Sequence, residues 1–385
     1  MTRRGLLGVG AGAGAGVLLA ACGTTAAEST APRPSLQGSS GASTADRVLR
    51  FSNWPAYIDV PDEGQPSTLD DFRASTGIEV EYTEDINDGS EFYAKVRPQL
   101  ELGEDIGRDL LVFSEETARI FIEMGFAAPL DYSLIPNAAN LLPRLRESSI
   151  DPGRRYTLPW QAGFTGFGWN AALLQSTLGV ATMSSFEQFF DPRLKGRVAV
   201  LSETMDTMGL MLAWQGDDPA DFTDAQFDDA LAVLQRYIDD GTIRQVAGND
   251  YISGLESGDL VASLGWSGDV LALGGGFGFG LPDSGGLVWA DAMVIPSTAE
   301  HTVNAERLMN FYYDPEVAAR LAAWIQYVCP VEGAQEAMAS VDPSLVNDPW
   351  IFPSPQILDA AATVQGMTMA RTEDLDRRFD TVVNG

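Results

Sequence analysis

Short apolar runs alternate with helix-like segments from residue 48 onward. Residues 48–51 predict a short strand, and residues 78–82 alternate apolar and polar side chains as a second strand. Between them, Ser67 and Asp70 resemble a helix-capping pair, and Gly77 is typical of the residue that follows a helix. The first elements are therefore predicted to be a strand, a helix and a strand.

The same alternation continues through the middle of the chain. Residues 109–113 predict a buried strand, after which Ser114 can cap a helix that ends near Gly125. Two more apolar runs, at residues 198–201 and 261–266, predict further strands.

Two later helices carry clear start signals. Thr223 and Gln226 form a capping box, and residues 227–238 place apolar side chains at helical spacing until Gly241. Residues 314–324 start with Asp-Pro, which also begins helices. Strands that alternate with helices predict an α/β protein with mainly parallel sheets, and the chain is long enough for two lobes.

The N-terminus carries export signals. Arg3 and Arg4 precede an apolar run over residues 5–21, which is the pattern of a signal peptide, and residues 19–22 have the form of a bacterial lipobox ending at Cys22. The stretch TRRGLL also resembles a twin-arginine signal. We therefore expect a lipid anchor at Cys22; the alternative is an N-terminal helix that is not cleaved.

Residues 23–46 are rich in Ser, Thr, Ala, Gly and Pro and have few apolar side chains to bury, so we expect a flexible tether. The chain has 54 acidic and 24 basic residues, a formal net charge of -30, and its lysines are Lys95 and Lys195. Such a surface repels nucleic acid and favours a cationic ligand, although high solubility alone explains the charge equally well.

Catalytic and metal chemistry find little support in the sequence. His301 is the one histidine, so no histidine triad and no multi-histidine metal site can form. Residues 274–280 are glycine-rich but lack the lysine of a phosphate-binding loop, and we interpret them as a bulge or turn. We expect no cofactor, no metal and no enzyme activity, and we interpret Cys329 as a buried apolar residue.

Aromatic and acidic residues gather in loops that follow predicted strands, where open α/β sheets bind ligands. The stretches are NWPAY at 53–57, GWSGD at 265–269 and VWAD at 288–291. Carboxylates beside indole faces suit an alkylammonium ion, because the carboxylate accepts a charged hydrogen bond and the indole attracts the cation.

Each of these residues also has a purely structural interpretation. Trp266 and Trp289 can be core residues that flank a strand, since tryptophan is mostly buried. Asp269 and Asp291 can cap helices or close turns. Their joint occurrence after strands favours a binding site.

These residues resemble the spermidine and putrescine binding proteins of ABC importers over nearly all of the segment after the tether. The matching stretches are NWPAY at 53–57, DLLVFS at 109–114 with EMGFAAPLD after it, LPWQAGFTGFGWN at 158–170, GWSGD at 265–269, VWADAMVIP at 288–296 and YVCPV from Tyr327. The sequence departs from the family at Pro55, Ala56 and Glu116, which leaves the identity of the cation open.

The resemblance implies that five aromatic residues wall the ligand, that two aspartates hold ammonium groups, that one serine offers a hydroxyl, and that two further acids face the ligand from the second lobe. In that order they are Trp54, Tyr57, Trp266, Trp289 and Tyr327; Asp269 and Asp291; Ser114; Glu203 and Asp206.

The resemblance further implies a two-lobed periplasmic-binding-protein fold of type II with a central ligand cleft that closes by a hinge. We expect residues 1–22 as a lipoprotein signal peptide and 23–46 as a linker. Lobe 1 is expected to contain residues 47–164 and 292–337, and lobe 2 residues 165–291 and 338–385.

The expected function is capture of a polyamine and its delivery to an ABC permease and ATPase complex by a monomer anchored to the outer face of the cytoplasmic membrane. The alternative is a binding protein for a neutral solute such as a sugar, which would not need Asp269 and Asp291 together.

Overall fold

A mixed sheet of ten strands forms the centre of the fold in the computed structural model, which describes residues 46–60, 66–364 and 366–385. The strands are β1 Val48–Asn53, β2 Glu79–Glu84, β3 Leu110–Ser114, β4 Thr157–Asn170, β5 Val198–Leu201, β6 Ile243–Ala247, β7 Ala262–Trp266, β8 Phe277–Gly280, β9 Gly286–Val294 and β10 Ala361–Ala362.

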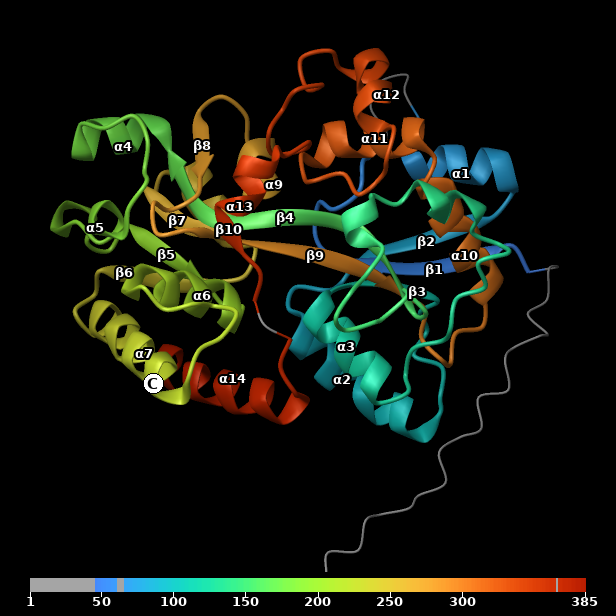
Figure 1. Ribbon diagram of the computed structural model, residues 1–385, viewed down its shortest axis with the longest axis horizontal. Coiled ribbons are helices and arrows are strands. Elements are labelled where there is room, and N and C mark those ends of the chain that lie inside the picture. The colour runs from blue at the N-terminus through green and yellow to red at the C-terminus, as the bar shows by residue number, and fades with distance from the viewer. Residues whose placement is uncertain (1–45, 61–65, 365) are drawn as a thin grey trace, which may run out of the picture. The chain divides into compact units, whose positions relative to one another are not determined.

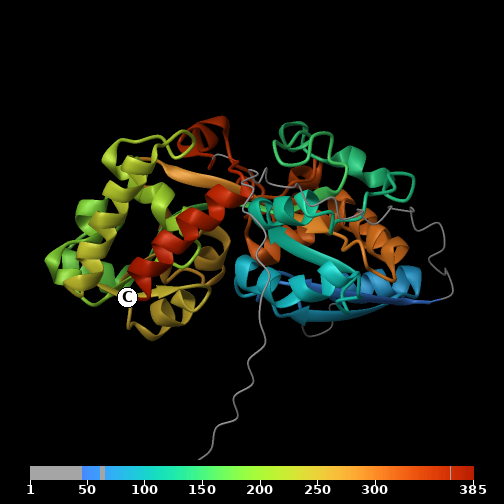
Figure 2. The same ribbon diagram turned by 90° about the horizontal axis from the view of Figure 1, so that it is seen from below.

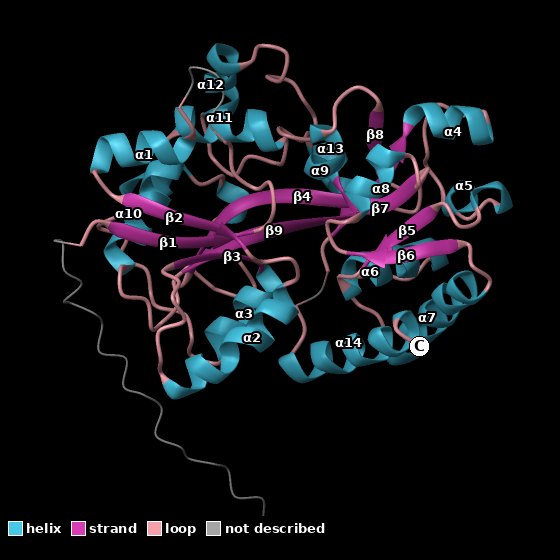
Figure 3. Ribbon diagram, turned by 180° about the vertical axis from the view of Figure 1, so that it is seen from behind, coloured by secondary structure: helices cyan, strands magenta, loops and turns pink. Residues whose placement is uncertain are grey.

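Helices cover both faces of this sheet (Figures 1 and 3). They are α1 Thr68–Thr76, α2 Gly89–Leu102, α3 Glu115–Glu123, α4 Ala171–Leu178, α5 Phe186–Phe189, α6 Thr204–Gln215, α7 Asp224–Asp239, α8 Tyr251–Ser257, α9 Ser267–Ala272, α10 Thr302–Tyr312, α11 Pro315–Ile325, α12 Ala334–Val341, α13 Pro355–Asp359 and α14 Met369–Val383. Among the described residues, no helix combines the length and the hydropathy that crossing a membrane requires.

The two longest strands, β4 and β9, lie next to each other in the middle of the sheet and connect its two ends. The order is β2-β1-β3-β9-β4-β7-β5-β6, with β10 on β9 and β8 on β4. β9 pairs with β3 through residues 291–294, and β4 pairs with β7 through residues 165–169. The helices gather into two groups around the two ends of the sheet (Figure 2).

The predicted start and stop signals are confirmed. Ser67 caps α1 in a capping box with Asp70, and Gly77 follows the helix in the left-handed conformation at φ 69°. Thr223 and Gln226 form the capping box of α7. Ser114 accepts a hydrogen bond from the backbone N–H of Thr117 and so caps α3.

Two sequence interpretations need correction. The sheet is mixed and not mainly parallel: among the described residues, five strand pairings are parallel and four are antiparallel, and each antiparallel pairing involves β4 or β9. Glycines 274–280 do not all lie in a bulge or turn: residues 277–280 form β8 and pair with β4. A Cβ at Gly278 would lie 2.4 Å from the ring of Trp169, so glycine permits this close strand pairing.

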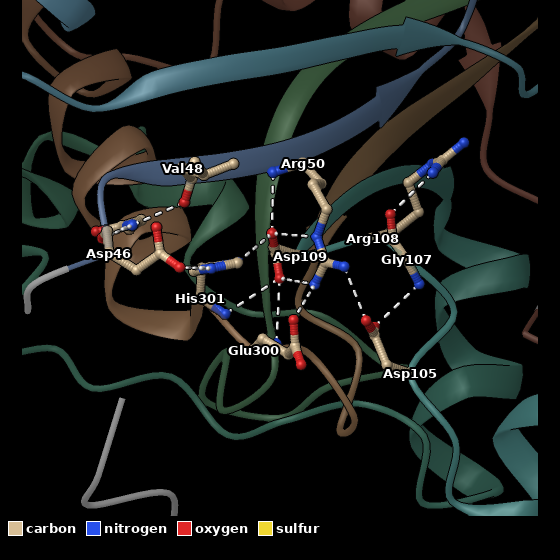
Figure 4. Close-up of polar contacts among 10 residues, drawn as sticks. Asp46, Val48, Arg50, Asp105, Gly107, Arg108, Asp109, Glu300 and His301 are labelled. Atoms are coloured by element: carbon tan, nitrogen blue, oxygen red, sulfur yellow. Dashed lines mark hydrogen bonds and ion pairs between the residues drawn. The ribbon is translucent and has the colours of Figure 1, made fainter. Parts of the chain in front are cut away.

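A buried ion-pair network fixes the beginning of β1 (Figure 4). Asp109, which is fully buried, accepts hydrogen bonds from the Arg50 guanidinium at 2.9 and 3.0 Å and contacts the Nδ1 of His301 at 2.9 Å. The Nε2 of His301 lies 3.2 Å from the carboxylate of Asp46. The histidine therefore ties the chain before β1 to the start of α10.

This network predicts a pH-dependent contribution of His301 to stability. Burial acts to lower the pKa of His301, but hydrogen bonds to Asp109 and Asp46 outweigh it and raise the pKa above 6.5. The stabilisation is therefore complete below pH 6.5 and is lost as the pH rises through the raised folded value. We expect His301→Gln to lower the free energy of unfolding by about 1 kcal/mol at pH 6 and by less at pH 9, as urea denaturation would measure. An equal loss at both pH values would contradict this role.

The predicted signal peptide, the lipid anchor at Cys22 and the tether up to residue 45 lie outside the described residues. Cys329 is buried, as expected.

Candidate functional site

A cavity of about 520 Å³ lies beside the long central strands. Its walls include all ten residues for which the sequence predicts a binding role: Trp54, Tyr57, Ser114, Glu203, Asp206, Trp266, Asp269, Trp289, Asp291 and Tyr327. These residues come from six separate segments of the chain, which the fold brings to one place.

The loop after β1 supplies Trp54 and Tyr57. Buried Asn53 accepts a hydrogen bond from the Trp54 backbone N–H at 2.9 Å, and the Trp160 indole N–H donates to the Tyr57 carbonyl at 3.2 Å. Ala56 takes a positive φ of 54°, which reverses the chain between the two aromatic residues. Tyr57 therefore points its hydroxyl at Asp291, to which it donates at 2.7 Å.

Asp269 is held by three groups at the start of α9. The hydroxyl of Tyr327 donates to it at 2.7 Å, the amide of Asn249 at 3.0 Å and the hydroxyl of Tyr251 at 3.4 Å. Asp269 makes no helix-capping hydrogen bond. The helix-cap alternative therefore does not account for this aspartate, nor for Asp291, which lies within β9.

A relay of hydrogen bonds links Asp206 to both tryptophans. Thr165 donates to Asp206 at 2.6 Å and accepts from the Trp289 indole at 2.9 Å, while the Trp266 indole donates to Asp206 at 2.9 Å. The relay fixes both rings by their N–H edges. Trp266 is 8% exposed and also lines the cavity. It is therefore both a residue of the core and a residue of the cavity wall.

Glycines let the aromatic rings approach the strands. A Cβ at Gly163 would lie 2.5 Å from the Trp289 ring, and a Cβ at Gly268 would lie 2.3 Å from the ring of Tyr327. Tyr327 packs edge-on against Tyr57 with 5.3 Å between the ring centres. The aromatic wall is therefore closely packed and fixed in position.

Burial controls the charge state of the acids. It raises the pKa of Asp269 to about 6, although the hydroxyls of Tyr327 and Tyr251 oppose the shift. Burial also raises the pKa of Asp291 to about 7 against the hydrogen bond from Tyr57, and the charge of Asp206 adds to the rise. Within the described residues, no arginine, lysine or histidine forms an ion pair with either carboxylate. A bound cation would therefore stabilise their charged forms.

Glu203 and Asp206 follow β5 at the start of α6. Burial raises the pKa of Glu203 well above its usual range, and the nearby charges of Asp88 and Asp206 raise it further. One carboxylate oxygen, Oε1, is buried without a hydrogen-bond partner among the described residues. The same is true of the Trp54 indole nitrogen.

Further residues at the site could not be predicted from the sequence: Asn249 lines the cavity, and Thr165 and Tyr251 lie behind the wall and contact the acids that line it. Thr165, Asn249 and Tyr251 orient the acids, and their polar side chains carry no signal of that role in the sequence. Arg154 and Arg119 reach the wall as well, but each is paired with a glutamate: Arg154 with Glu115 at 2.8 Å and Arg119 with Glu123 at 2.9 Å. Within the described residues, no group of acidic, histidine and cysteine side chains is arranged to hold a metal ion.

The chain is similar in sequence to bacterial solute-binding proteins. Residues 67–353 match the family model described as bacterial extracellular solute-binding protein. The chain is 27% identical over 328 residues to the putrescine-binding periplasmic protein PotF of Escherichia coli K12. That alignment covers 80% of this chain and 83% of PotF. It is 26% identical over 367 residues to the putrescine-binding periplasmic protein SpuD of Pseudomonas aeruginosa. That alignment covers 89% of this chain and 94% of SpuD.

Solved structures share the two-lobed fold. A putative spermidine/putrescine ABC transporter protein from Listeria monocytogenes superimposes with a TM-score of 0.75 at 24% identity, covering 88% of this chain and 99% of that one. The TpPotD lipoprotein of Treponema pallidum gives a TM-score of 0.72 at 19% identity, covering 88% and 100%. At sequence identities of 24% and 19%, this structural similarity shows a shared fold.

Proposed function

We propose that this chain, which belongs to the bacterial extracellular solute-binding proteins, captures a polyamine such as spermidine or putrescine in the cavity and delivers it to an ABC importer. The family binds solutes, and we propose that the cavity binds without catalysing a reaction. The names of the relatives, which include putrescine-binding and spermidine/putrescine-binding proteins, support a polyamine as the solute.

The observation that carries the proposal is the position of Asp269 and Asp291 beside Trp266 and Trp289 in one cavity. A primary ammonium group donates charged hydrogen bonds to a carboxylate, and an indole face covers the adjacent methylenes at roughly 0.5–2 kcal/mol per contact. Glu203 and Asp206 offer further negative charge to the same ligand. A linear molecule with ammonium groups separated by methylenes satisfies both features.

A neutral solute fits this cavity less well. Sugar sites also use tryptophan faces, but burying four carboxylates costs free energy that a sugar does not offset. Burial raises the pKa of each of Glu203, Asp206, Asp269 and Asp291, so each carboxylate is charged only at a cost. A cationic ligand offsets this cost directly.

We further propose that the cavity lies between two lobes that close on the ligand by a hinge in β4 and β9. The proposed lobe boundaries are those given above, 47–164 with 292–337 and 165–291 with 338–385. Ligand that contacts both lobes favours the closed state. For the exported protein we propose a lipid at Cys22, the tether 23–46 and a monomeric state, which would keep the binding protein close to its permease and ATPase.

Ligand-induced stabilisation tests the function. At a concentration of 100 times the dissociation constant, spermidine or putrescine should raise the free energy of unfolding by about 2.7 kcal/mol. Thermal unfolding of the protein with spermidine, putrescine, cadaverine, glucose and maltose would measure this effect. We expect at least one amine to raise Tm and neither sugar to do so. A sugar that raises Tm while the amines do not would overturn the proposal.

A further inference from the structure

The C-terminal helix α14 is firmly attached on one side. Arg378 pairs with Asp228 of α7 at 3.1 Å, and Arg371 pairs with Asp224. The apolar side chains of Leu375 and Phe379 are each 1% exposed and belong to the same buried cluster as those of α6 and α7. This side of α14 is therefore a fixed part of the second lobe proposed above (Figure 3).

The opposite side of α14 faces α2 and α3 of the first lobe, and this contact is loose. The apolar side chains of α2 and α3 form a separate buried cluster, which contains no α14 residue among those the structure describes. A cavity of about 530 Å³ lies between the helices, with Tyr93 and Ile120 on one wall and Asp376 and Thr381 on the other. An interface without a shared apolar core can separate at modest cost.

One side chain, Thr372, crosses this interface. Its hydroxyl donates to the Oε1 of Glu116 at 2.8 Å and accepts from the Nη2 of Arg119 at 3.2 Å. Thr372 and Arg119 are each 6% exposed, so both contacts are shielded from water. In the described part of the chain, these are the only side-chain hydrogen bonds between α14 and either α2 or α3.

We propose that Thr372 is a positioning residue that holds the two lobes together in the ligand-bound state. The inference rests on the proposed function, because it assigns this interface to the closed form of a cleft that opens. Thr372 does not line the ligand cavity, whereas Glu116 and Arg119 do. The threonine therefore acts on the ligand through closure of the lobes and makes no contact with it.

Like charges across the interface explain why closure needs such a contact. Glu116 and Asp88 on the first lobe face Glu203 and Asp376 on the second. Burial raises the pKa of Asp376 to about 6, and the charges of Glu116 and Asp88 add to the rise. Repulsion between these acids opposes closure of the lobes, and the ligand together with Thr372 offsets it.

Replacing Thr372 by Val tests the proposal, because valine keeps the shape and removes the hydroxyl. A hydrogen bond to a charged group corresponds to about a tenfold change in an equilibrium constant. We expect koff for spermidine, measured by stopped-flow fluorescence of the full-length protein, to rise about tenfold with little change in kon. Thr372→Ser, which keeps the hydroxyl, should restore koff.

Thr381→Val is the matched control. The hydroxyl of Thr381 donates to the carbonyl of Arg377 within α14 and makes no contact across the interface with α2 and α3. If Thr372 acts by closure, putrescine and spermidine dissociate faster by the same factor. A larger factor for one amine means that the variant acts through Glu116 as a ligand contact, and an unchanged koff means that the contact has no role; either result overturns the proposal.

A readout without ligand separates this inference from the function itself. In the unliganded protein the Thr372 contact forms in the fraction of molecules that is closed. Hydrogen exchange of the unliganded protein should therefore be faster in α3 and α14 for Thr372→Val than for Thr381→Val. If the unaltered protein binds neither amine, the proposed polyamine function is wrong. The hydrogen-exchange rates of the two unliganded variants then remain as the test of the role of Thr372. Equal exchange in the two variants would then overturn the positioning role.

Discussion

Asp291→Asn is expected to weaken spermidine binding about 100-fold, the order of loss found when one member of a buried charged pair is removed. Asparagine has the size of aspartate and can still accept the hydrogen bond that the Tyr57 hydroxyl makes to Asp291 at 2.7 Å. The variant therefore removes the charge and keeps the shape of the wall. Isothermal titration of both proteins with spermidine at pH 8 would measure the loss.

Two controls show whether the loss comes from charge in the cavity. Ser114→Ala should cost no more than a few-fold, because Ser114 is neutral and its hydroxyl already serves as the cap of α3. Asp283→Asn removes the same net charge from an exposed position outside the cavity and should leave affinity unchanged. Equal losses for Asp291→Asn and Ser114→Ala would argue against ionic recognition.

Acidification should weaken polyamine binding strongly, by roughly 100-fold or more between pH 8 and pH 5. Burial raises the pKa of Asp269 to about 6 and that of Asp291 to about 7, so both carboxyls are largely protonated at pH 5 in the empty cavity. A protonated carboxyl is neutral and cannot pair with an ammonium group. Binding must therefore release protons in this pH range, and affinity rises with pH.

Titrations at pH 5, 6, 7 and 8 in two buffers of different ionisation enthalpy would measure both the affinity and the protons released. In Asp291→Asn, the step near pH 7 should disappear while the step near pH 6 remains. The spermidine amines stay protonated through most of this range, so the ligand contributes little to the change. Affinity that does not vary with pH would mean that neither aspartate pairs with the ligand.

The sequence predicted the local elements well where the cause is local. The capping boxes at Ser67 and Thr223 and the glycine after α1 act within a few residues, and the structure confirms all three. It did not predict that β4 and β9 run antiparallel through the middle of the sheet, because their pairing joins residues more than a hundred positions apart. Strand β8 was missed because its glycines resemble a turn, and only the adjacent Trp169 explains them.

The candidate site shows the same division. Stretches that combine tryptophan and aspartate are visible in the sequence, and all ten predicted residues line one cavity. The prediction that VWAD at 288–291 lies in a loop after a strand is wrong, because these residues lie within β9. The contacts that fix them are not visible: Thr165 joins Asp206 to Trp289, and Tyr327 reaches Asp269 from another segment. Thr372 is likewise an ordinary helix residue in the sequence. Its position between Glu116 and Arg119 depends on how α14 packs.

A crystal structure of the protein with spermidine tests the proposed ionic recognition most directly. We expect the ligand to lie in the cavity with ammonium groups within hydrogen-bonding distance of Asp291 and Asp269. Its methylenes should lie against the faces of Trp266 and Trp289. A spermidine bound elsewhere, or a complex in which these two carboxylates contact no ammonium group, would contradict it.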